Sequence, residues 1–425
     1  MNLKMNLPSD RLGQNQLTSI QHLVRSLPLG VCLLLLSWHT AALAANPKHV
    51  KRLLEAKVCP NCDLKGADLK NANLKDANLT EAELEGADLS GADLTNATLE
   101  RANLRGAKLV KANLTQANLR QSKLVFLEGI ATNLTEANLQ GANLEEAEVS
   151  GAELPSTNLM MAKLARANFS AANLTSANLQ KADLTGAKLK AATLNGANLT
   201  EAQLSQADLE ISQLNRANLT GANLSQAQLS AARLQGTILQ KIQANKAVFI
   251  KAYLQDADLT QANCSQANFQ EAGLQRANLT GADLSYADLS GALMASTNLT
   301  NSNLMGANLA LASLDKANLQ QANLSGVDLR QSQLTGANLT NSTLVGATLG
   351  SANLEGAQVV SSNLTYTNLT SAKLGQSNLE NSNFSYANLT GADLEQAKIT
   401  GAKFDYANLK QITGIDPQLL VPKSK

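Results

Sequence analysis

The chain of 425 residues carries almost no net charge, +1 with neutral histidines. This balance argues against nucleic-acid binding, which requires a basic patch or stripe. Aromatic residues form only 3% of the sequence, too few for the cores of the two or three conventional globular domains that this length could hold.

Residues 1–44 have the pattern of a secretion signal. Arg25 precedes an apolar stretch from Leu27 to Leu36, and Ala42-Leu43-Ala44 is an A-x-A cleavage site. The apolar stretch is too short for a comfortable membrane span. We therefore expect export, with no membrane span in the mature chain, whose net charge would be about −1. A disordered or membrane-anchoring N-terminus is the alternative.

Residues 45–63 are expected to form an N-terminal cap. Val50, Leu53, Leu54 and Val58 recur at helical spacing and predict a short amphipathic helix. Cys59-Pro60-Asn61-Cys62 follows the helix. In an oxidising compartment, Cys59 and Cys62 would form a structural disulfide. Free thiols remain an alternative, as does a redox or metal role, although metal binding would need two further ligands.

The largest part of the chain is a five-residue repeat. From Leu64 to Leu409 every fifth residue is Leu or a close substitute, which gives about 70 units without insertion or deletion. Most of these leucines are preceded by Asn or Asp and, one residue earlier, by a small residue, as in Ala67-Asp68-Leu69 and Ala277-Asn278-Leu279. A period of five fits neither a helix nor a strand, so each unit is one edge of a larger coil.

This frame resembles that of pentapeptide-repeat proteins from about Cys62 to Leu409. The resemblance implies an all-β fold, a right-handed quadrilateral parallel β-helix in which four units make one coil. The repeat domain, residues 64–410, would then form about 17 coils, with residues 20 apart stacked at about 4.8 Å. The N-terminal helix would cover the open first coil. Residues 411–425 would form a C-terminal cap, a tail or an end-to-end homodimer contact.

Two stretches depart from the repeat pattern while keeping the count. Gly129, near Phe126 and Ile130, stands where Leu is expected, and so does Ala244, between Ile238 and Ile250. We expect local bulges or kinks at both places.

Four of the five tyrosines share one register of the 20-residue period. These are Tyr286, Tyr366, Tyr386 and Tyr406, and Gly306, Gly326 and Gly346 occupy the steps between the first two. An exposed aromatic ladder beside glycine gaps is a candidate contact surface for a protein or a glycan. The alternative is that stacked tyrosines only stabilise adjacent coils.

A second register is rich in threonine. Its members are Thr200, Thr220, Thr260, Thr280, Thr300 and Thr340. A flat Asn-x-Thr lattice on this face could bind a polysaccharide or ice, although Thr is also a good strand residue without any ligand.

No catalytic constellation, cofactor site or metal site is predicted, since His49 is the only histidine left after cleavage. We expect a non-enzymatic scaffold or interaction platform with an unknown protein partner. The signal, the C-x-x-C cap and the long repeat resemble exported cyanobacterial members of the family, which implies the periplasm or the thylakoid lumen. A DNA mimic directed at topoisomerases, a role found in the family, is less favoured because acidity and a cytosolic address are missing.

Overall fold

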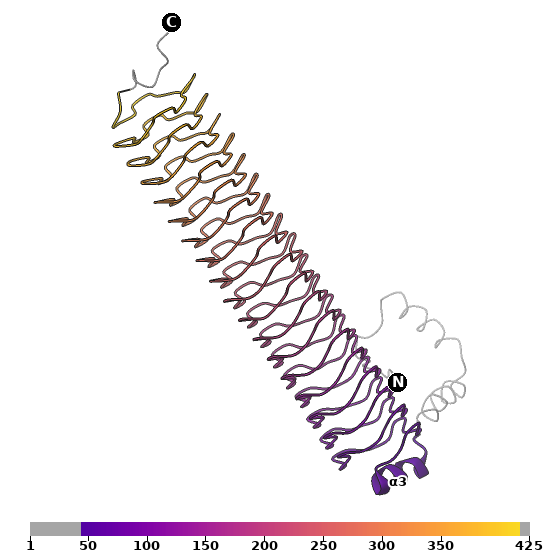
Figure 1. Ribbon diagram of the computed structural model, residues 1–425. Helices are drawn as coiled ribbons and strands as arrows, with labels where there is room; N and C mark the ends of the chain where they lie inside the picture. Colours follow the sequence, from indigo (N-terminus) through magenta and orange to yellow (C-terminus); the bar gives the residue numbers. More distant parts are fainter. Residues whose placement is uncertain (1–43, 417–425) are drawn as a thin grey trace, which may run out of the picture.

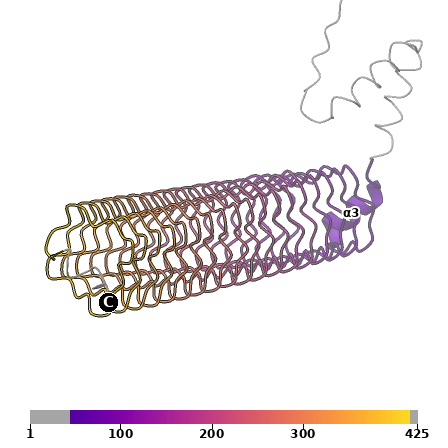
Figure 2. The same ribbon diagram turned by 90° about the horizontal axis from the view of Figure 1, so that it is seen from above.

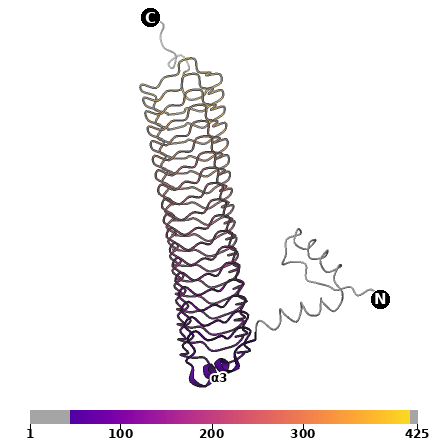
Figure 3. The same cartoon turned by 90° about the vertical axis from the view of Figure 1, so that its right-hand side faces the viewer.

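The computed structural model describes residues 44–416, and in this range the chain winds into one elongated rod of stacked coils (Figure 1). The 90° views show the same coils following one another along the whole rod (Figures 2 and 3). One helix, α3 (Pro47–Ala56), lies across the N-terminal end. The expected signal at residues 1–44 lies outside the described residues except for Ala44, and so do residues 417–425. No helix between residues 44 and 416 is long and apolar enough to cross a membrane.

Contacts between coils are single-residue parallel β-bridges that always join residues 20 apart. They run from Val58↔Asn78 to Asp393↔Thr413 without a change of step. Backbone hydrogen bonds accompany each bridge; the Leu64 N–H, for example, donates to the Glu83 carbonyl at 2.8 Å. Four five-residue units therefore return the chain to the same side of the rod, and the backbone groups of each coil are satisfied by the next.

A tight turn connects successive units, and it gives the repeat its shape. The Ala67 N–H donates to the Leu64 carbonyl at 3.0 Å, and Gly66, between them, has a φ of 65°. Positive φ at the third turn residue is the signature of a type II turn, which favours Gly. Most of the residues in this position are not glycine; Asn71, for example, has a φ of 54°. The left-handed conformation costs such residues about 1–2 kcal/mol each.

Where Asn or Asp precedes the central Leu, its side chain forms a second turn beside this one. Thus the Thr200 N–H donates to Asn198 Oδ1 at 3.1 Å. This Asx turn recurs along the rod and explains why the position prefers Asn and Asp. Amides also bond up the stack, as from Asn158 Nδ2 to Asn138 Oδ1 at 3.0 Å.

The interior is filled by the central leucines and the small residues two positions before them, nearly all fully buried. Where Ser or Thr replaces Ala, the hydroxyl donates to a backbone carbonyl, as from Ser122 to Leu119 at 2.7 Å. Phe249 and Phe269 stack inside the rod with ring centroids 4.7 Å apart. Burial of each Leu contributes about 1.5–3 kcal/mol.

The bulges expected at Gly129 and Ala244 are wrong. Parallel bridges continue through both stretches, from Lys108 to Glu128 to Glu148 in the first. In each unit the large and small residues have exchanged places: Leu127 and Ile242 occupy the small position and are buried. The exchange conserves the volume inside the coil, so the backbone keeps its course.

The short helix expected near residue 53 is present as α3. Asn46 Oδ1 accepts from the Lys48 N–H at 3.0 Å, Pro47 follows at the first helical position, and Lys57 ends the helix with a φ of 54°. Leu53 is completely buried against the first coil, whereas Leu54 is half exposed. At the other end the last bridge reaches Thr413, and Ile412 and Ile415 pack partly buried against the core.

Candidate functional site

The four tyrosines of one register all occupy the positive-φ turn position, with φ between 57° and 62°. We call their column, which recurs every 20 residues along one corner of the rod, the aromatic corner. The side chains are exposed: Tyr286 by 60%, Tyr366 by 62%, Tyr386 by 50% and Tyr406 by 81%. The turn thus projects each ring into solvent, and the backbone N–H groups of Tyr286, Tyr366 and Tyr386 donate to carbonyls of the next coil.

Three of these tyrosines form a continuous stack. The ring centroids of Tyr366 and Tyr386 are 4.9 Å apart with planes 5° from parallel, and Tyr386 and Tyr406 follow at 5.0 Å and 11°. Beneath them, Phe384 and Phe404 stack inside the rod at 5.0 Å. The coil spacing imposes this geometry, and the result is an exposed aromatic ridge on a rigid support.

Tyr286 stands apart from the stack. Its ring lies over Gly306, where an added Cβ would meet Tyr286 Cε1 at 2.6 Å. Gly326 and Gly346 have nothing within 4 Å of an added Cβ, so the corner is open between Gly306 and Tyr366.

Phe126 belongs to the same column, a relationship missed in reading the sequence. It is 45% exposed, occupies the turn position with a φ of 57°, and precedes Tyr286 by eight steps of 20 residues. The Arg105 guanidinium carbon lies 5.5 Å from its ring centroid, a cation–π contact. Counting all aromatic residues, and not tyrosines alone, by the 20-residue period would have found it.

The threonine column is half-buried and its hydroxyls are used within the rod. Five of the six donate to the Asn or Asp two residues earlier, at distances from 2.5 to 2.7 Å. The hydroxyls of Thr260, Thr280 and Thr300 also accept an amide N–H from the next coil. For Thr340 only the backbone N–H bonds to its neighbour, Asn338, at 3.1 Å. These hydrogen bonds hold the turn within each unit and, at Thr260, Thr280 and Thr300, also join it to the next coil.

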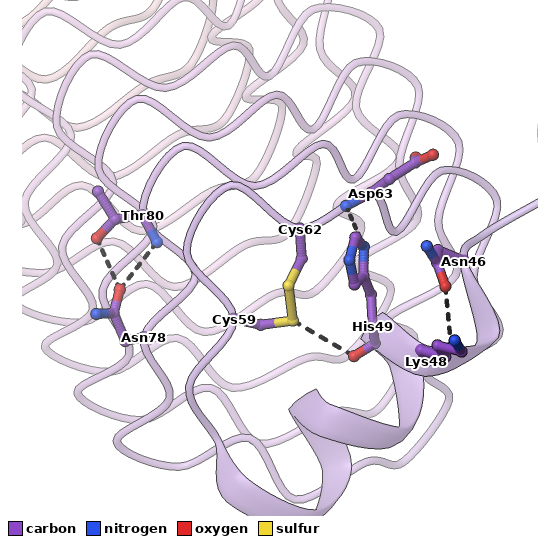
Figure 4. Close-up of a disulfide and its surroundings, with 8 residues drawn as sticks. All are labelled: Asn46, Lys48, His49, Cys59, Cys62, Asp63, Asn78 and Thr80. Atoms are coloured by element: carbon purple, nitrogen blue, oxygen red, sulfur yellow. Dashed lines mark hydrogen bonds between the residues drawn. A yellow bond between two sulfur atoms is a disulfide. The ribbon is translucent and has the colours of Figure 1, made fainter.

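Helix α3 meets the first coil around the two cysteines (Figure 4). The sulfur atoms of Cys59 and Cys62 lie 2.02 Å apart, at disulfide distance, and both residues are buried. The imidazole of His49 points at Asp63, whose N–H donates to His49 Nδ1 at 3.0 Å, while the Asp63 carbonyl accepts from the Asn46 N–H at 3.1 Å. The start of α3 is thus tied to the first coil through both backbone groups of one residue.

Charges along the rod pair between coils. Arg276 and Asp256 are 2.7 Å apart, and Arg166 and Glu146 2.8 Å.

Burial raises the pKa of Cys264 to about 12, and the nearby Asp283 carboxylate adds to this, so the thiol is inert at neutral pH. Between residues 44 and 416 no group of three His, Cys, Asp or Glu residues could hold a metal ion.

Comparison with known proteins places these features in one family. The family model described as "Pentapeptide repeats (8 copies)" matches in overlapping segments that together cover residues 61–125 and 132–413. The break between them contains Leu127 and Gly129, the unit in which large and small residues are exchanged. A comparison with curated proteins gives no match.

Several solved structures are similar to the chain. HetL, a pentapeptide repeat protein involved in heterocyst differentiation regulation from the cyanobacterium Nostoc sp. strain PCC 7120, is 31% identical over 55% of this chain and 88% of its own, with a TM-score of 0.26. A pentapeptide repeat protein of the Arabidopsis thaliana thylakoid lumen is 32% identical over 25% of this chain and 68% of its own, with a TM-score of 0.19. QnrB1, a plasmid-mediated fluoroquinolone resistance protein, is 16% identical over 48% of this chain and 97% of its own, with a TM-score of 0.30.

TM-scores this low do not support a family relationship, so the family of this chain is established by the repeat itself. The family match covers well over half of the residues. The chain therefore belongs to the pentapeptide repeat family, whose repeats imply a right-handed quadrilateral β-helix.

Proposed function

We propose that the protein is a non-enzymatic, exported scaffold that presents the aromatic corner to a protein partner. The observation that carries the proposal is the stack of Tyr366, Tyr386 and Tyr406, three exposed rings at 4.9–5.0 Å spacing on a rigid rod. Aromatic rings bury large areas on binding, and rings that are already ordered lose little conformational entropy. Exposed aromatic side chains gathered in one column are typical of a contact surface.

Further features of the proposal concern the rest of the chain. Residues 1–44 would direct export to the periplasm or the thylakoid lumen, where Cys59 and Cys62 would remain oxidised. Residues 45–63, with α3, would cap a solenoid of about 17 coils, residues 64–410. The segment 411–425 would act as a second cap, a tail or an end-to-end dimer contact.

Crosslinking and affinity capture from the native exported fraction tests the interaction. The variant carries Ala at Tyr286, Tyr366, Tyr386 and Tyr406. A matched control carries Ala at four turn positions with the same backbone conformation on other corners, namely Gln321, Gln331, Gln376 and Gln396. A partner captured by wild type and by the glutamine control, and lost by the folded tyrosine variant, is the expected result. A partner retained by the tyrosine variant would overturn the proposal.

Binding of a polysaccharide or ice on the threonine column is the second candidate. Its motivation is the regular spacing of half-buried threonines on one face, although their hydroxyls already bond within the rod. Charged substitutions at Thr260, Thr280 and Thr300 would abolish such binding, while the tyrosine variant would retain it. A topoisomerase-directed DNA mimic is a third and less favoured candidate, because acidic side chains of the rod pair with arginines of neighbouring coils.

A further inference from the structure

The aromatic corner carries aromatic residues and glycines in a pattern that continues to the N-terminal end of the rod. Its glycines lie in two runs and one single step, and all have φ near 65°. The first run is Gly66, Gly86 and Gly106, the single step is Gly186, and the second run is Gly306, Gly326 and Gly346. An added Cβ at Gly86 or Gly106 would have nothing within 4 Å, so these steps are open notches in the corner.

The columns of two rods are complementary in shape when the rods lie side by side and antiparallel with the midpoints of the two columns aligned. In that alignment, residues of this column whose numbers add to 472 lie opposite each other, and residues at equal offsets from such a pair, for example 65 and 405 beside 66 and 406, also face each other. All five aromatic side chains in this column of one copy then face a glycine of the other: Tyr406 faces Gly66, Tyr386 faces Gly86, Tyr366 faces Gly106, Phe126 faces Gly346 and Tyr286 faces Gly186. The stacked ridge of one rod thus meets the first glycine run of the other at the same coil spacing.

The corner consists of two turn columns, the aromatic column itself and the column of the residues just before it, such as residue 65. Charges in both columns agree with this alignment. Lys65 would face Asp405, and no pair in either column brings like charges together. In the columns on either side of the corner, two facing pairs have opposite charges, Lys403 with Asp63 and Lys188 with Asp288. Two other pairs are both acidic, Glu148 with Asp328 and Asp183 with Asp283. Asp328 already has the Arg330 guanidinium as a partner at 2.6 Å.

We propose that a second copy of this chain binds the aromatic corner side by side and antiparallel, with aromatic rings of each copy entering the glycine notches of the other. The interface is isologous, as in most homodimers. A contact about 80 Å long and about 10 Å wide covers about 800 Å² per copy, the size of a standard stable interface. This inference rests on the proposed role of the aromatic corner as a contact surface and names its partner.

Filling the notches tests the inference without touching the aromatic residues. The variant Gly86→Gln/Gly106→Gln places, in two open steps, a residue that the same column holds with positive φ at Gln206 and Gln226. The matched control is Gly151→Gln/Gly356→Gln, two notches equally open but on other corners. Sedimentation velocity of the purified full-length protein should show a dimer for wild type and the control. The notch variant should dimerise at least tenfold more weakly.

A cysteine crosslink tests the orientation. Position 226 of one copy would lie opposite position 246 of the other, one coil from the partner's own position 226. Gln226→Cys should therefore give a covalent dimer on mild oxidation, whereas Gln376→Cys, on another corner, should not. In an end-to-end dimer position 226 lies far from its symmetry mate in the partner.

The outcomes separate this inference from the proposed function. A monomeric wild type whose captured partner is lost with the four tyrosines would overturn the antiparallel dimer and leave the platform intact. A dimer that survives the notch variant, with no crosslink at position 226, would also overturn it. A dimer lost in the notch variant and trapped by Gln226→Cys supports both.

Discussion

The ring of Tyr286 lies over Gly306, one coil further along the rod, so closely that a Cβ on the glycine would come within 2.6 Å of Tyr286 Cε1. Gly326, the next residue of the column, has the same backbone conformation but nothing within 4 Å. Glycine is therefore favoured at Gly326 by the positive φ alone, whereas at Gly306 it is also favoured by the space that the neighbouring ring needs.

Replacing each glycine by Ala should distinguish these reasons. Gly326→Ala should cost about 1 kcal/mol, because only the left-handed conformation opposes it. Gly306→Ala carries the same conformational cost and must also displace the Tyr286 ring, so it should be the more destabilising. Denaturant unfolding of both variants measures the difference, and equal losses would show that the ring contact is unimportant.

The exchanged unit at Leu127 and Gly129 gives a second prediction. A Cβ at Gly129 would lie 3.2 Å from Leu127 Cδ2, so Gly129→Leu should overpack the interior and cost about 1–3 kcal/mol. Leu127→Ala should leave a cavity and cost about 2–5 kcal/mol. The double variant Leu127→Ala/Gly129→Leu restores the usual unit and should unfold near the wild-type denaturant midpoint. Additive losses in the double variant would contradict the volume exchange.

Much of this fold could be predicted from the sequence because one count, repeated without error, reports which residues stack. The family resemblance supplied four units per coil, and the bridges between residues 20 apart agree with it. The prediction of a bulge at Gly129 was wrong because it considered the central position alone. Its partner, Leu127, two residues earlier, supplies the missing volume.

The site was predicted less completely. Counting by 20 placed the four tyrosines in one column, but the positive φ of that column follows from the turn and not from any tyrosine preference. The sequence placed Tyr286 on the same corner four coils before Tyr366, and the side-chain positions add that its ring covers Gly306. Nothing in the sequence predicts that the threonine hydroxyls are used within the rod; the Thr200 hydroxyl, for example, donates to Asn198 Oδ1, which also accepts the Thr200 N–H.

Loss of the two cysteines should loosen the N-terminal end alone. The bond between Cys59 and Cys62 closes a very short loop, so Cys59→Ser/Cys62→Ser should cost about 2 kcal/mol. Since each coil contacts only its neighbours, amide hydrogen exchange should speed up in residues 45–80 and stay unchanged near residue 250. Faster exchange throughout the rod would show that the end controls the stability of the whole.

Acid should weaken the ionic contact at Asp328. The hydrogen bond from Arg330, opposed by partial burial, holds the pKa of Asp328 below its ordinary value. A carboxyl with a lowered folded pKa stabilises the fold fully above its unfolded pKa of about 4, and that contribution is lost as pH falls through the folded value. Wild type should therefore lose more stability than Asp328→Asn between about pH 5 and pH 2. Denaturant unfolding at each pH measures the free energy of unfolding of both proteins. Equal losses of stability would contradict this assignment.

The most direct test of the aromatic corner as a contact surface is covalent tyrosine footprinting in the native cell fraction that contains the protein, compared with the purified protein at a dilution where it is monomeric. Tyr253 is 47% exposed in another column and serves as an internal control. Modification of Tyr286, Tyr366, Tyr386 and Tyr406 should fall in the native fraction while that of Tyr253 stays constant. Equal modification of all five tyrosines in both samples would contradict the account.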